Sequence, residues 1–79
     1  MPTGCVTVSQ AAEQLRRDRG FVRLLIHDGY LRTRTYYEAG RRGQRVRCFA
    51  IPIGGIVAYQ RALYEGNGAL EYLRKVNGR

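Results

Sequence analysis

The first part of the chain has apolar residues at helical spacing. Val8, Ala12 and Leu15 recur every three or four residues, which predicts a helix over residues 10–17. Ser9 directly precedes this range, and its hydroxyl can accept a hydrogen bond from a free backbone N–H, so we expect it to be the N-cap.

A second helix is predicted over residues 19–27. Asp18 is its expected N-cap, and Gly29 its expected C-terminal glycine. Its inward face is formed by Val22, Leu25 and Ile26. Two short helices joined by a few residues are typical of a helix-turn-helix unit.

The period then changes from helical to alternating. Residues 31–37 and 44–51 alternate and are rich in β-branched and aromatic residues, which predicts two strands. The glycine-bearing segment 38–43 between them predicts a hairpin turn. A brief strand is also expected around Val6 and Val8.

The last third of the chain returns to helical spacing. Pro52 suits the first turn of a helix, and Ile56, Tyr59 and Leu63 form an apolar stripe, so we predict a third helix over residues 52–63. The order of elements predicts an α+β fold: a winged helix-turn-helix with a two-stranded β-hairpin wing and a packing third helix. Residues 1–65 would form this domain, and residues 66–79 a C-terminal tail with a short helix over 69–76.

The distribution of charge along the chain indicates a function as well as a fold. The chain carries 14 Lys and Arg against 6 Asp and Glu, for a net charge of +8, and Lys75 is its only lysine. Most of the excess lies between residues 16 and 47. Arginine presents a planar fork of donors suited to phosphates and guanine edges, so this segment predicts a nucleic-acid surface rather than a generally cationic one.

Other chemistry is sparse. Cys5, Cys48 and the single histidine, His27, do not match a zinc site, and we interpret both cysteines as reduced thiols. We find no paired carboxylates, nucleophile–base pair or phosphate loop, so we expect no enzyme activity, no cofactor and no metal. No signal peptide or membrane segment is apparent, and no membrane partner is expected, which favours a cytoplasmic, nucleoid-associated protein.

Three segments in order resemble one known family. Residues 6–15 (VTVSQAAEQL) look like a first helix of the form T-V-x-x-A-A-x-x-L. Residues 22–31 match V-x-x-L-I-x-x-G-x-L, and residues 51–59 resemble I-P-x-x-x-L-x-A-Y. Residues 6–63 thereby resemble the excisionase-like branch of the MerR-type winged-helix DNA-binding proteins. The chain departs from the family at Arg16 and Arg17, where glycine and valine are usual, and at Gly20 and Phe21.

The resemblance implies sequence-specific binding of double-stranded DNA by an architectural factor. Such a recombination directionality factor bends DNA and assists a separate integrase, with cooperative self-association on DNA. The alternative is a small transcriptional regulator or phage repressor with the same fold. Regulators of the wider family usually carry a long dimerising helix, and none of the helices predicted here is long enough to be one. Charge alone would also permit RNA binding, or a protein-interaction module with incidental charge.

We expect the DNA contacts to come from the second helix and the hairpin. Arg19 and Arg23 would face base edges, and the hairpin tip would reach the minor groove or its flanking phosphates. The expected DNA-binding residues are Arg16, Arg17, Arg19, Gly20, Arg23, His27, Arg32, Arg34, Arg41, Arg42, Arg45 and Arg47.

The tyrosines allow two interpretations. Stacking on single-stranded bases is one. Packing is the interpretation we favour, with Tyr30 and Tyr59 at element boundaries and Tyr36 and Tyr37 in the hairpin.

Overall fold

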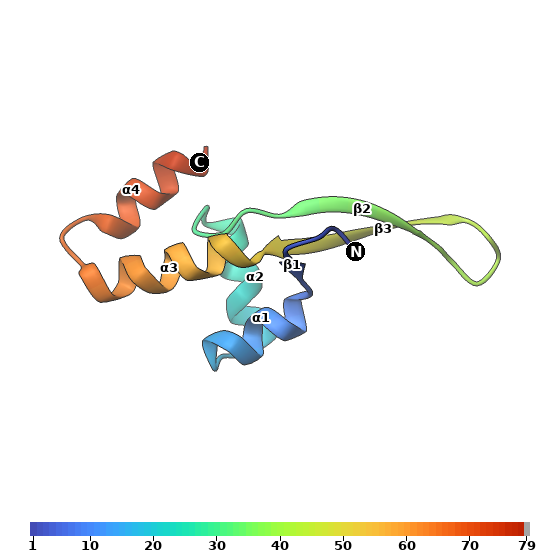
Figure 1. The fold of residues 1–79 in the computed structure, drawn as a ribbon, viewed down its shortest axis with the longest axis horizontal. Coiled ribbons are helices and arrows are strands. Elements are labelled where there is room, and N and C mark those ends of the chain that lie inside the picture. Colours follow the sequence, from blue (N-terminus) through green and yellow to red (C-terminus); the bar gives the residue numbers. More distant parts are fainter. Residues whose placement is uncertain (79) are drawn as a thin grey trace.

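The computed structural model describes residues 1–78 as an α+β fold with a three-stranded antiparallel sheet in the order β1-β3-β2. The elements are β1 (Cys5–Val6), α1 (Val8–Leu15), α2 (Arg19–His27), β2 (Arg34–Ala39), β3 (Arg45–Pro52), α3 (Ile53–Glu65) and α4 (Ala69–Val76). The molecule is elongated, 49 × 25 × 21 Å, because the β2–β3 hairpin extends from one end while α3 and α4 lie at the other (Figure 1).

The core lies where α1, α2 and α3 meet β3. Its largest fully buried side chains are Val22, Ile51 and Ile56, one from each of α2, β3 and α3. Burying such a side chain stabilises the fold by about 1.5–3 kcal/mol. From α1, Ala11 and Ala12 complete this cluster, and their small side chains allow α2 to pack closely.

Helix α1 begins earlier than expected, and the predicted N-cap Ser9 is wrong. The N-cap is Thr7: its hydroxyl accepts from the backbone N–H of Gln10 at 3.1 Å, and the Gln10 side chain accepts from the Thr7 N–H at 2.9 Å. This reciprocal capping box satisfies two N–H groups at once, which Ser9 could not do without a partner three residues on. The helix also ends earlier, at Leu15, because Arg16 adopts a left-handed conformation with φ of 58°.

Helix α2 occupies the predicted range. Asp18 is its N-cap, and its carboxylate accepts from the backbone N–H of Phe21 at 2.7 Å. Gly29 follows the helix with φ of 89°, a conformation that a residue with a Cβ rarely adopts. Two local signals therefore fix both ends of this helix.

The sheet differs from the predicted two-stranded wing. At the base of the hairpin, β1 adds a third strand by pairing Val6 with Ile51, while Val8 belongs to α1 rather than to a strand. Strand β2 begins at Arg34, not at Leu31. Leu31 is 3% exposed and its N–H donates to the carbonyl of Leu25 at 3.3 Å, so it packs in the core and is hydrogen-bonded to the end of α2.

Helix α3 begins one residue later than predicted. Pro52 is the last residue of β3, with ψ of 132°, and the helix starts at Ile53. It runs on to Glu65, beyond the predicted end at Leu63. No helix within residues 1–78 combines the length and apolar character needed to cross a bilayer.

Helix α4 spans the predicted range but buries no side chain fully. Three long-range hydrogen bonds, here called the C-terminal clamp, tie it to the segment after α2. The Arg32 guanidinium donates to the Val76 carbonyl at 2.6 Å, Arg74 Nε donates to the Asp28 carbonyl at 3.0 Å, and Asn77 Nδ2 donates to the Gly29 carbonyl at 2.9 Å.

Candidate nucleic-acid interface

The register of the hairpin divides its side chains between two faces. Directly paired residues of antiparallel strands project to the same side. Tyr37 pairs with Arg47, Thr35 with Phe49, and Ala39 with Arg45. We call the face formed by Thr35, Tyr37, Arg45, Arg47 and Phe49 the basic–aromatic face. It combines cations and rings, and none of the residues paired on it is acidic.

The arginines of this face lie over its aromatic rings. The Arg45 guanidinium carbon is 4.5 Å from the centre of the Tyr37 ring, and that of Arg47 is 5.1 Å from the centre of the Phe49 ring. At exposed sites such cation–π contacts stabilise by about 0.5–1 kcal/mol each. The contacts also restrict two long side chains, which reduces the entropy that they would lose on binding a ligand.

The packing interpretation of the tyrosines holds for only some of them. Tyr59 is 5% exposed and packs edge-to-face against Tyr30, with ring centres 6.0 Å apart. Tyr37, in contrast, is 54% exposed and belongs to the basic–aromatic face. The sequence reasoning also missed Phe49, which is 49% exposed. The available signal was the two-residue spacing, which places Phe49 on the same face as Arg45 and Arg47.

Other predicted site residues lie away from this face. Arg34 pairs with Ala50, so it projects from the opposite side of the hairpin. Arg32 precedes β2 and donates to α4 through the C-terminal clamp. Tyr36 lies on the same face of the hairpin as Arg34, opposite the basic–aromatic face. Partial burial raises the pKa of its phenol, with smaller contributions from Glu38 and Cys48. Tyr36 is therefore neutral at physiological pH.

Two predicted cations form the tip of the hairpin. Arg41 and Arg42 are exposed in a turn that is closed by a hydrogen bond of 2.7 Å from the Gly40 N–H to the Gln44 carbonyl. The Gln44 side chain also accepts from the Arg42 N–H at 2.9 Å. The turn thus has a defined backbone while its two guanidinium groups extend into solvent.

Helix α2 presents a second exposed surface. Arg19, Gly20, Arg23 and His27 are all exposed, and Leu24, which the sequence reasoning did not single out, is 59% exposed. Arg19 is the first residue of the helix. His27 is the last, and its Nδ1 lies 3.3 Å from an Asp28 carboxylate oxygen. The first turn of α2 therefore carries one cation, Arg19, directly after the acidic cap Asp18.

The turn between α1 and α2 holds the two remaining predicted residues. Arg16 and Arg17 are both exposed. The Arg17 guanidinium carbon lies 3.8 Å from the centre of the Phe21 ring, so Arg17 covers this ring at the start of α2. Neither residue is placed on the hairpin.

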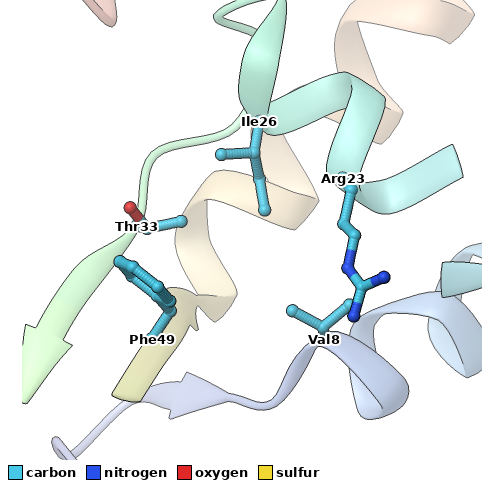
Figure 2. A pocket seen from close by; sticks show the side chains of 5 residues that line it. All are labelled: Val8, Arg23, Ile26, Thr33 and Phe49. Atoms are coloured by element: carbon cyan, nitrogen blue, oxygen red, sulfur yellow. The ribbon is translucent and has the colours of Figure 1, made fainter. Parts of the chain in front are cut away.

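A pocket of about 380 Å³ joins α2 to the hairpin (Figure 2). It is lined by Val8, Arg23, Ile26, Thr33 and Phe49. Arg23 extends from α2 toward Val8, while Phe49 and Ile26 line the opposite part of the pocket (Figure 2). Because Phe49 belongs to the basic–aromatic face, the pocket makes this face continuous with the exposed side of α2.

The cationic side chains of this surface are not neutralised internally. Within residues 1–78, the one close pairing of a basic and an acidic side chain is His27 with Asp28. The charges of Arg19, Arg23, Arg45 and Arg47 are thus available to an anion. No group of three His, Cys, Asp or Glu residues in the same range lies close enough to hold a metal ion.

Comparison with known proteins finds no matching family model, no similar curated protein and no similar solved structure.

Proposed function

We propose that this protein binds duplex DNA through a winged-helix interface, with α2 in the major groove and the β2–β3 hairpin as the wing. Its role is that of an excisionase-like architectural factor, which bends DNA and assists a separate integrase. The observation that carries the proposal is the continuity of surface from the exposed side of α2, through the pocket at Phe49, to Arg47 and Arg45.

The dimensions of both elements fit a duplex. An α-helix with its side chains is about 10–12 Å across and the major groove is about 12 Å wide, so the exposed side of α2 can enter the groove. The six residues of β2 span about 20 Å, which allows the hairpin to cross a backbone strand to the next groove. Arg41 and Arg42 at the tip would then meet the minor groove or its flanking phosphates.

A salt-dependent shift assay tests the proposal. The probes are duplex DNA from the neighbourhood of the protein's own gene, random duplex of the same length, and single-stranded RNA. Laddered, cooperative complexes on the local duplex, with bending, support the architectural role. A single discrete complex at a promoter favours the alternative of a transcriptional regulator. Equal affinity for all three probes contradicts the winged-helix proposal.

Charge-matched variants separate the interface from general cationic attraction. Each phosphate contact contributes close to one unit to the slope of log affinity against log salt concentration, so Arg47→Ala is expected to flatten the slope by about one unit. Arg61→Ala removes the same charge from the exposed side of α3, at the other end of the molecule, and is expected to change the slope little. Equal changes in slope for both variants would contradict the assignment.

A base-reading role for α2 is tested separately. Arg19 stands at the first position of the helix, where a guanidinium can make a bidentate contact with guanine. Arg19→Ala is expected to reduce the preference for the local site by about 1–3 kcal/mol while leaving affinity for random duplex nearly unchanged.

A further inference from the structure

The pocket between α2 and the hairpin has an unusual lining for a surface otherwise rich in arginine. Three of its five lining residues, Val8, Ile26 and Phe49, are apolar, and a single cation, Arg23, borders them. Val8 and Ile26 are half-buried, while Phe49 remains 49% exposed. This part of the surface therefore differs from the hairpin tip, where only guanidinium groups and backbone are offered.

This inference rests on the proposed function, because the proposed docking decides which part of the DNA lies at the pocket. If α2 occupies the major groove and the hairpin reaches the neighbouring minor groove, the backbone strand that separates the two grooves passes between these elements. The pocket lies between these same two elements (Figure 2). A backbone unit presents one anionic phosphate and one sugar with an apolar carbon surface, which matches one arginine beside three apolar side chains.

We propose that the pocket binds a single deoxyribose-phosphate unit and discriminates against ribose. Arg23, which the sequence led us to expect at base edges, instead binds the phosphate from the pocket, and Arg19 is left for the base edges. Val8, Ile26 and Phe49 contact the sugar carbons. A 2′-hydroxyl directed at Val8, Ile26 and Phe49 would lose water on that side and gain no hydrogen-bond partner from these side chains, while the Arg23 donors face the phosphate. The hydroxyl oxygen of Thr33 points to the outer side of the pocket in Figure 2.

Site-by-site sugar substitution in the bound duplex tests this assignment with the unmodified protein. One ribonucleotide is placed at each position in turn, and a 2′-fluoro nucleotide serves as the control. The fluoro sugar has a pucker similar to that of ribose but carries no hydroxyl donor. We expect one or two adjacent positions at which ribose weakens binding by about fivefold, while 2′-fluoro has a smaller effect.

A pair of ring variants then connects the effect to the pocket. Phe49→Ala is expected to remove the penalty for ribose at that position, whereas Tyr37→Ala, on the same face but outside the pocket, retains it. Phe49→Leu keeps an apolar contact and is expected to retain part of the penalty.

Two results overturn the inference, and they are distinguishable. Specific duplex binding with no position sensitive to ribose contradicts the sugar pocket alone. Absence of duplex binding contradicts the proposed function together with the pocket. Sensitivity to ribose and 2′-fluoro in equal measure assigns the effect to sugar pucker and also overturns the inference.

Discussion

Helices α2 and α4 have similar lengths but are held in place by different interactions. In α2, Val22 is fully buried and Leu25 is 6% exposed, and Asp18 caps the N-terminus. In α4 no side chain is fully buried, and the N-cap Gly68 offers no side-chain hydrogen bond. The core contacts of α4 come from the partly buried Leu70 and Leu73.

Helix α4 is held in place mainly by the hydrogen bonds of the C-terminal clamp, because it buries little apolar surface. It joins α4 to the carbonyls of Asp28 and Gly29, directly after α2. Helix α2 is therefore fixed by the core, whereas α4 depends on polar contacts with a segment that α2 has already positioned. The comparison implies that α4 opens first and that the candidate interface survives its opening.

Truncation of one leucine in each helix should give the largest difference. Leu25→Ala leaves a cavity in the core and is expected to lower the free energy of unfolding by about 2–5 kcal/mol, a large share of the stability of a small domain. Leu73→Ala removes a half-buried side chain and should cost less than half as much. Urea denaturation measures both, and equal losses would contradict the comparison.

Removal of the α2 cap should have the next largest effect. Asp18→Ala leaves the Phe21 N–H without its acceptor and is expected to cost about 1 kcal/mol of stability. Asp28→Ala, the matched control at the other end of the helix, removes a carboxylate whose side-chain partner within residues 1–78 is the exposed His27. It should stay within about 0.5 kcal/mol of the parent. If the cap stabilises α2, Asp18→Ala must lower the free energy of unfolding more than Asp28→Ala does.

Loss of a clamp contact should act on α4 alone. Arg74→Met removes the hydrogen bond to the Asp28 carbonyl, worth about 0.5–1.5 kcal/mol, and the contact of the guanidinium with the Tyr30 ring. Amide hydrogen exchange should accelerate across residues 69–76 and remain unchanged in α2. Lys75→Met is the matched control, since Lys75 makes no clamp contact. Equal acceleration in both helices would show that they open together.

The smallest expected effect is confined to alkaline pH. Burial raises the pKa of Tyr59, Tyr30 adds to the shift, and the Arg17 cation opposes it. The folded protein then keeps the phenol proton at a pH where the unfolded chain has released it, so stability should fall as the pH rises above about 10. Tyr59→Phe should weaken this decline in thermal melts. An unchanged pH profile would assign the decline to other groups.

The sequence predicts elements better than their long-range partners. The bounds of α2 were predictable because Asp18 and Gly29 act within a few residues of the helix. The start of α1 was not, because Thr7 and Ser9 both satisfy the rule for an N-cap and only the reciprocal bond of Gln10 decides between them. The pairing of Val6 with Ile51 joins residues far apart in the chain, and no local pattern indicates it.

The candidate site shows the same division. Charge density identified the hairpin and α2 as the cationic segments. It did not reveal that Arg32 binds α4, because that contact depends on where the tail returns. Nor did alternation alone place Arg34 opposite Arg45 and Arg47, since the face follows from the register across the turn. The pocket combines α1, α2, the loop before β2, and β3, and so exists only in the folded chain.

The left-handed backbone at Arg16 has a consequence for engineering. A residue with a Cβ in this conformation carries roughly 1–2 kcal/mol of strain that glycine avoids. Arg16→Gly is thus a route to a more heat-resistant protein that carries one positive charge fewer beside α2. Arginine at position 16 makes the turn less stable but keeps a cation beside α2. A laboratory selection for thermostability alone would therefore be expected to replace Arg16.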